Sequence, residues 1–168
     1  MIILALGSNL DSVFGNRFIN INLALSYLQK YGIKILKKSS FYETPSYPDK
    51  SKPKFLNIVI SAETVLPPVD LMSVLIFIEE KLGRERKIKN DPRTCDIDII
   101  DYKSQIIDFN YNNISLSVPH KKLSSRNFVL FPLKEIQPSW THPITKEIID
   151  VLIKNLPEDE KKSILKVE

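Results

Sequence analysis

The chain has 168 residues, of which 43% are hydrophobic and 26% are charged, and its formal net charge is +4. These values are typical of one globular domain, expected here over residues 1–168. The single cysteine, Cys95, excludes an internal disulfide and is typical of the reducing cytoplasm, and no apolar run is long enough to cross a bilayer. The positive charge favours an anionic partner, either a phosphate-bearing small molecule or a nucleic acid.

The spacing of apolar residues predicts alternating strands and helices along the chain. Four apolar side chains recur at helical spacing within residues 14–31, and Gly32 follows as a suitable C-cap. Three prolines and no periodicity make residues 44–54 a loop, whereas Pro67 and Pro68 suit the first turn of a second helix. In chain order, we predict strand 2–6, helix 14–31, strands 33–42 and 55–64, helix 67–82, a strand from 92 to about 102, a hairpin within 103–117, a helical turn and apolar stretch within 117–136, and a short helix at 146–155.

This order of elements predicts the fold class. Strand, helix, two strands, helix and strand form the βαββαβ core of a ferredoxin-like α/β (α+β) fold. Its antiparallel sheet carries helices on one face and leaves the other face for ligands or for C-terminal additions. The order of elements does not fix a function, because function depends on the side chains of a site.

Two aspartates lie on one face of the strand that starts near residue 92. Side chains alternate along a strand, so Cys95, Ile97 and Ile99 share a core face while Asp96 and Asp98 share the other. Neighbouring carboxylates repel each other, and a magnesium ion, which prefers oxygen ligands, would hold them together. The alternative is a polar outer face on an edge strand, because isolated Asp-x-Asp patterns are common.

Basic residues precede these aspartates in a polar loop. Arginine binds phosphate oxygens in bidentate geometry and lysine neutralises them as a point charge. Strand alternation puts Arg93 on the Cys95 side, so a turn or bulge at Pro92 is needed to direct it towards an anion. A carboxylate pair beside such a loop is the equipment of phosphoryl transfer, and a solvated charged surface is the alternative. The basic residues are Arg84, Arg86, Lys87, Lys89 and Arg93.

Two further residues suggest a ring-shaped ligand and a nucleotide. Asn57 interrupts an apolar strand and must find polar partners, and Phe55 and Phe128 could flank a flat ring with polar edges. A backbone-capping asparagine is an equally favoured interpretation. His120 follows Pro119 and could donate to a phosphate or a nucleotide, or be an ordinary surface histidine. The chain has no GxxxxGK[ST] motif, so any ATP is not held by a P-loop.

Six stretches of the chain, taken together, resemble the 6-hydroxymethyl-7,8-dihydropterin pyrophosphokinase family of folate biosynthesis. They are LALGSNL, SSFYETP, FLNIVISAET, IEEKLGRERK, PRTCDIDII and VPHKKLSSRNFVLFPL, which occur in one order between residues 2 and 145. The resemblance implies transfer of pyrophosphate from ATP to the hydroxymethyl oxygen of a reduced pterin, with release of AMP and the assistance of two Mg²⁺ ions. It also implies that the loops at 44–54 and 84–93 are mobile and close over ATP.

The resemblance assigns roles to individual residues. It implies metal ligation by Asp96 and Asp98, and catalytic roles for these two residues with Arg84 and Arg93. Glu79 falls at an acidic position of the family, and Asn90-Asp91 stands where Trp-Gly is common, which removes an aromatic lid. The implied nucleotide-binding residues are Arg86, Lys87, Ile99, Ser117, His120 and Arg126. The implied pterin-binding residues are Thr44, Pro45, Phe55, Asn57 and Phe128.

The resemblance further implies a cytoplasmic monomer that acts on ATP and a pterin, without a nucleic-acid or membrane partner. Two other functions stay open. A metal-dependent phosphohydrolase would use Asp96 and Asp98 with water and would release phosphate without any pterin. A nonenzymatic RNA-binding ferredoxin-like module would use the basic loop, bind RNA with a steep salt dependence and need no magnesium. The predicted strands lack an RNP-type aromatic run, which weakens the RNA-binding alternative.

Overall fold

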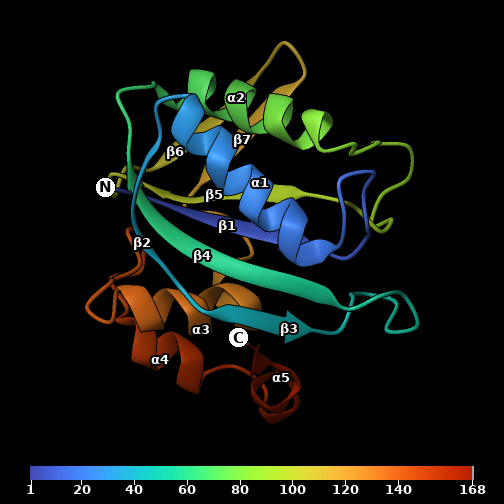
Figure 1. Cartoon of the computed structure of the whole chain (residues 1–168). Coiled ribbons are helices and arrows are strands. Elements are labelled where there is room, and N and C mark those ends of the chain that lie inside the picture. The colour runs from blue at the N-terminus through green and yellow to red at the C-terminus, as the bar shows by residue number, and fades with distance from the viewer. Residues whose placement is uncertain (168) are drawn as a thin grey trace.

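The computed structural model describes residues 1–167 and consists of a large antiparallel sheet, a separate hairpin and helices on both sheet faces (Figure 1). The strands are β1 (Ile2–Ser8), β2 (Lys34–Lys38), β3 (Phe41–Thr44), β4 (Phe55–Glu63), β5 (Asp96–Tyr102), β6 (Ile107–Tyr111), β7 (Ile114–Val118) and β8 (Leu165–Val167). The helices are α1 (Arg17–Lys30), α2 (Pro68–Lys81), the 3-10 turn η1 (Leu123–Ser125), α3 (Asn127–Ile136), α4 (Ile149–Lys154) and α5 (Glu158–Ser163). None of the helices within residues 1–167 has the length and apolar character needed to span a membrane.

The main sheet has the order β5-β1-β4-β3-β8, and β2 also pairs with β4. Every pairing within it is antiparallel. The predicted fold class is therefore confirmed. The first strand lies inside the sheet between β5 and β4, and both of its faces are covered by a core, which explains why its residues form an unbroken buried run.

Alternate side chains of β1 enter two different cores. Ile2, Leu4 and Leu6 belong to the core beneath α1 and α2, whereas Ile3 and Ala5 belong to the core covered by α3 and α4. Figure 1 shows these two pairs of helices on opposite sides of the sheet. The C-terminal helices thus cover part of the face that the sequence left for ligands or additions, and the remainder of that face carries the candidate site.

The predicted helices form with small shifts at their ends. Helix α1 begins at Arg17 because the Asn16 side chain accepts a hydrogen bond from the Ile19 amide at 3.1 Å. Gly32 and Gly83 adopt φ values of 82° and 87° just after α1 and α2, a conformation that favours glycine at helix C-termini. Helix α2 and the hairpin of β6 and β7 lie where the sequence predicts them, and α4 falls within the predicted 146–155.

The prediction of one strand over residues 33–42 was wrong, because the chain breaks into β2 and β3 at Ser39 and Ser40. The Ser39 amide donates to the Val59 carbonyl at 3.0 Å, but the Val59 amide donates to the Ser39 hydroxyl, also at 3.0 Å. A side-chain oxygen thus replaces a backbone carbonyl in the ladder. The strand predicted from residue 92 starts only at Asp96, and α5 and β8 were not predicted at all.

Candidate active site

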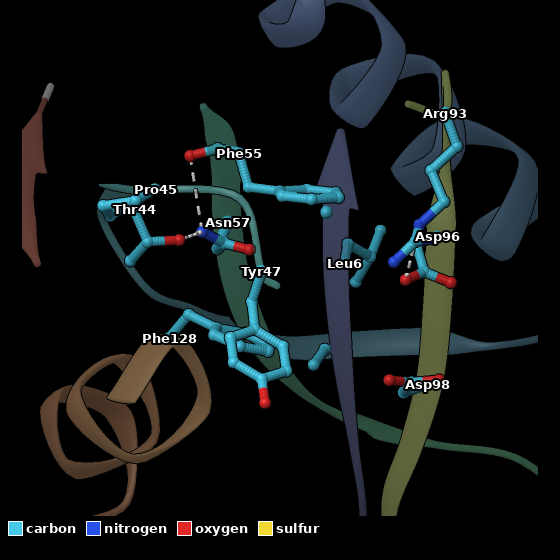
Figure 2. A pocket seen from close by; sticks show the side chains of 12 residues that line it. Leu6, Thr44, Pro45, Tyr47, Phe55, Asn57, Arg93, Asp96, Asp98 and Phe128 are labelled. Carbon is cyan, nitrogen blue, oxygen red and sulfur yellow. Dashed lines mark hydrogen bonds and ion pairs between the residues drawn. The ribbon is translucent and has the colours of Figure 1, made fainter. Parts of the chain in front are cut away.

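The two aspartates of β5 lie side by side on the sheet face opposite α1 and α2, and both line one cavity (Figure 2). Asp96 is paired with Gly7 of β1 and Asp98 with Ala5, so small neighbours leave both carboxylates accessible. The intervening Ile97 is buried in the core on the other face. The strand therefore presents a carboxylate pair to the cavity while its apolar residues fix it to the core.

Three arginines surround this carboxylate pair. Arg84 Nη1 lies 2.7 Å from Asp96 Oδ1, and Arg93 Nε lies 3.0 Å from Asp96 Oδ2. Arg126 Nη1 lies 2.6 Å from Asp98 Oδ2. Burial acts to raise the pKa of Asp96, but Arg93 and Arg84 outweigh it and hold that pKa below its ordinary value. Asp96 is therefore ionised at neutral pH, and each of the two carboxylates is in contact with at least one arginine.

Arg93 reaches Asp96 because the chain is not yet a strand at this point. The Arg93 amide donates to Asn9 Oδ1 at 2.8 Å, and its carbonyl accepts from the Asn9 amide at 3.1 Å. These two bonds hold the backbone just after Pro92 and replace the strand alternation that would have turned Arg93 towards the core. The Arg93 guanidinium also lies 5.1 Å from the centre of the Phe55 ring.

The cavity beside the carboxylates, called here the aromatic pocket, is open at one end to Asp96, Asp98 and Arg93. Asn57 lies in its wall, and its amide group donates to Thr44 Oγ1 at 3.0 Å and to the Tyr42 carbonyl at 3.3 Å. A methyl group on Gly7 would lie 3.3 Å from Asn57 Oδ1, so glycine leaves this oxygen room. The other side chains lining the pocket come from Ala5, Leu6, Thr44, Pro45, Tyr47, Phe55 and Phe128.

A second hollow, called here the His120 hollow, shares Asp98 with the aromatic pocket and so adjoins it. His120 Nδ1 accepts a hydrogen bond from the Lys122 amide at 3.1 Å, and its Nε2 lies 3.9 Å from Asp98 Oδ2. Burial lowers the pKa of His120 below its ordinary value, although Asp98 opposes this effect, so the ring is neutral at pH 7 with its proton on Nε2. The remaining lining residues are Met72, Ile99, Ser115, Leu116, Ser117 and Lys121.

The basic loop, residues 84–93, lines a third hollow that meets the aromatic pocket at Arg93. Arg86 contacts Glu79 of α2, and Lys87 contacts its neighbour Glu85. The structure therefore brings Arg84, Arg93 and Arg126 to the carboxylates but leaves Arg86 and Lys87 further along the loop.

Glu79 is a buried carboxylate behind this loop. Its Oε1 lies 2.8 Å from Arg84 Nη1 and accepts the Ile97 amide at 2.8 Å. Burial raises the pKa of Glu79 to about 7, an effect that Arg84 opposes and the charge of Asp96 reinforces.

The family model described as 7,8-dihydro-6-hydroxymethylpterin-pyrophosphokinase (HPPK) matches residues 3–138, well over half of the chain. The chain belongs to the HPPK family. The resemblance inferred from the sequence motifs is thereby confirmed.

Individual relatives of this HPPK chain agree with the family match. The 2-amino-4-hydroxy-6-hydroxymethyldihydropteridine pyrophosphokinase of Aquifex aeolicus is 36% identical over 144 residues, which cover 86% of this chain and 84% of that protein. The folic acid synthesis protein fol1 of Schizosaccharomyces pombe is 37% identical over 155 residues, or 92% of this chain. This chain spans only 20% of the length of that fungal protein.

Solved structures support the fold of the HPPK chain. The crystal structure of Plasmodium falciparum HPPK-DHPS with SDX-DHP matches with a TM-score of 0.72 over 90% of this chain and 42% of that chain. The sequence identity is 18%, so this likeness concerns the fold alone.

The carboxylate pair fits a magnesium ion bound together with a phosphate ligand. Within residues 1–167 there is no group of three or more acidic, histidine or cysteine side chains that could hold a metal ion. Magnesium is commonly held by one or two protein carboxylates while phosphate and water oxygens complete its coordination. Asp96 and Asp98, partly accessible and open to the cavity, supply such a pair.

Three residues of the candidate site were not identified from the sequence as parts of it. Asn9 donates to Ser46 Oγ at 3.1 Å and to the Pro53 carbonyl at 3.0 Å, and so joins the 45–54 loop to Arg93. Tyr47 lines the aromatic pocket although 80% of its surface is exposed. The resemblance placed Glu79 at an acidic position of the family but gave it no role. The one available signal was a polar Asn9 placed directly after an apolar strand.

Proposed function

We propose that this HPPK chain transfers pyrophosphate from ATP to 6-hydroxymethyl-7,8-dihydropterin and releases AMP and the pterin diphosphate, as a step of folate biosynthesis. One observation carries the proposal. The carboxylate pair, with its three arginines, lies where the aromatic pocket and the His120 hollow meet. Two substrates bound in these adjoining spaces would present their reacting groups to each other at the carboxylates.

The aromatic pocket suits the pterin. Phe55 and Phe128 offer aromatic surfaces for a flat ring, and the amide hydrogens of Asn57 are already bound by Thr44 and Tyr42. Asn57 Oδ1 accepts no side-chain or backbone donor within residues 1–167 and is the atom available to a ring N–H. The pocket therefore recognises a flat ring by its faces and by a donor on its edge.

The His120 hollow suits the adenosine part of ATP, with Ile99 as an apolar wall and Ser117 and the Nε2–H of His120 as polar groups. The phosphates then extend to Asp96 and Asp98, where we infer that two magnesium ions are held. When bound, these ions supply positive charge that neutralises the transferring group. Arg84, Arg93 and Arg126, already at the carboxylates, bind the remaining phosphate oxygens.

In the transfer itself, the pterin hydroxymethyl oxygen forms a bond to the β-phosphorus of ATP as the bond from that phosphorus to the AMP oxygen breaks, and the hydroxyl proton is released to solvent. The residues of this chain form no covalent intermediate in this step. They orient the two substrates, exclude water and stabilise the charge on the phosphate oxygens. We infer that one chain carries the complete site and acts as a monomer.

A nucleotide product assay tests the proposal. The protein is mixed with ATP, magnesium and 6-hydroxymethyl-7,8-dihydropterin, and AMP is resolved from ADP. We expect pterin-dependent AMP, reduced about a hundredfold or more in Asp96→Asn and Asp98→Asn because each variant loses a carboxylate that would hold the magnesium ions. Asp150→Asn on α4, remote from both cavities, is the matched control. ADP or free phosphate formed without the pterin would favour the phosphohydrolase instead.

A further inference from the structure

We propose that Glu79 is a positioning residue for phosphate binding, which holds Arg84 and Arg86 of the basic loop in place beside the carboxylate pair. The inference rests on the proposed function, since it concerns how the same site receives the phosphates of ATP. It adds a residue on α2 that touches neither the aromatic pocket nor the His120 hollow.

Both oxygens of the Glu79 carboxylate are occupied. Oε1 lies 2.8 Å from Arg84 Nη1 and accepts the Ile97 amide at 2.8 Å, and Oε2 contacts Arg86 Nη2. The Ile97 amide lies between Asp96 and Asp98 in the chain, so Glu79 is tied to the strand at the carboxylate pair itself. One side chain thus connects α2, the basic loop and β5.

Glu79 also anchors the start of the loop through its backbone. Its carbonyl accepts the Arg84 amide at 3.0 Å, just after Gly83 turns the chain out of α2. Arg84 is thereby held at both its amide and its guanidinium, and its side chain is only 11% exposed. The same Nη1 atom lies 2.7 Å from Asp96 Oδ1. The position of this cation is fixed before any ligand arrives.

A purely structural role for Glu79 is the competing interpretation. The other buried side chains of Pro68–Lys81 are Leu71, Leu75 and Ile78, so an apolar residue would suit this helix face. Glu79 is 2% exposed, and a buried carboxylate is costly unless it is paired. Its partners are two arginines of a loop that has no regular structure of its own. A loop cation that is held in advance loses less conformational freedom when phosphate binds.

The test measures binding of the magnesium complex of α,β-methylene-ATP by titration calorimetry. The titration is made at pH 8, where the Glu79 carboxylate is ionised. Glu79→Gln keeps the length of the side chain and an acceptor for the Ile97 amide but removes the charge. We expect the Kd to rise about tenfold or more. Glu80→Gln, the neighbouring exposed glutamate of the same helix, is the matched control and should bind like the wild type.

A double-mutant cycle separates positioning from a structural role. If Glu79 acts through the two arginines, Glu79→Gln should change the Kd by less than about twofold when Arg84→Ala and Arg86→Ala are already present. An effect of the same size in both backgrounds, or a single variant that binds like the wild type, would overturn the proposal. Should Glu79→Gln not fold, Glu79→Met offers an apolar side chain of similar length for the same cycle.

This experiment also distinguishes the two proposals. A wild-type protein that binds the nucleotide analogue but forms no AMP would refute the pyrophosphokinase function and leave the role of Glu79 measurable. Normal AMP formation with an unchanged Kd in Glu79→Gln would instead refute the positioning role alone.

Discussion

Asn57 is buried at the wall of the aromatic pocket with its amide hydrogens bound to Thr44 and to the Tyr42 carbonyl. These bonds orient the side chain, so its oxygen faces the pocket beside Gly7 (Figure 2). The sequence left a capping role and a ligand-binding role equally open. The geometry is compatible with both, because one end of an amide can bind the protein while the other binds a ligand.

We predict that Asn57→Ala weakens binding of the pterin ring by about ten- to a hundredfold, because it removes the acceptor Oδ1 and leaves Thr44 Oγ1 without its donor. The measurement is fluorescence titration with oxidised 6-hydroxymethylpterin. Ser61→Ala, a buried polar residue at the far end of the same strand, is the control and should bind normally. Equal affinity of Asn57→Ala and the wild type would contradict the assignment of this pocket to the pterin.

Some residues of the candidate site could not have been found from the sequence, because their partners are distant in the chain. Asp96 and Asp98 were found since strand alternation alone places them together. Asn9 contacts Arg93, 84 positions away, and Glu79 contacts Ile97, 18 positions away. No local pattern encodes such contacts, which depend on the order of strands in the sheet.

Among the elements, the two loops at the mouth of the site contact each other directly. Lys52 Nζ lies 3.4 Å from Asp91 Oδ1 and 3.2 Å from the Asn90 carbonyl. Asp91 stands where the resemblance implies the glycine of Trp-Gly, and from the sequence we inferred the loss of an aromatic lid and an added negative charge there. The structure gives this acid a partner on the opposite loop, and the two loops are joined by an ion pair.

We predict that Asp91→Asn loosens this contact without destabilising the fold. Exposed ion pairs contribute less than about 1 kcal/mol, so the unfolding transition should hardly move. Amide hydrogen exchange within residues 84–91 should become severalfold faster. Asp49→Asn is the control. Asp49 lies in the 45–54 loop with Lys52 but binds Ser51, so its substitution should leave exchange in 84–91 unchanged. Unaltered exchange in Asp91→Asn would mean that the pair does not restrain the basic loop.

The elements that the sequence predicted well are those with a long periodic pattern or clear end signals. Helices α1 and α2 each end before a glycine with positive φ, and β4 is a long apolar run. The break at Ser39 was missed because a serine hydroxyl can substitute for a backbone group without changing the apolar pattern. Strand β8 has three residues and takes its place only by pairing with β3, which no local signal could indicate.

For the molecule as a whole, buried titratable side chains make the free energy of unfolding depend on pH. Burial raises the pKa of Glu79 from its ordinary 4.5 to about 7, while burial lowers the pKa values of His120 and His142. Between pH 4.5 and 7 the folded state therefore holds a proton on Glu79 that the unfolded chain has released. The histidines act in the opposite sense, because the unfolded chain binds protons more readily there as the pH falls.

The contribution of Glu79 can be isolated by comparing unfolding in urea for the wild type and Glu79→Gln. Because the raised pKa belongs to the folded state, the free energy of unfolding due to Glu79 is largest below pH 4.5 and falls as the pH rises to 7, by about 3 kcal/mol. The glutamine variant lacks this decrease. The difference in free energy of unfolding between Glu79→Gln and the wild type should therefore rise by about 3 kcal/mol between pH 4.5 and 7.5. The histidine contributions cancel in the comparison, and Glu80→Gln should follow the wild type. Parallel pH profiles of Glu79→Gln and the wild type would mean that Arg84 and Arg86 keep the Glu79 carboxylate ionised throughout. Their attraction would then offset the free-energy cost of burying the charge that positions them.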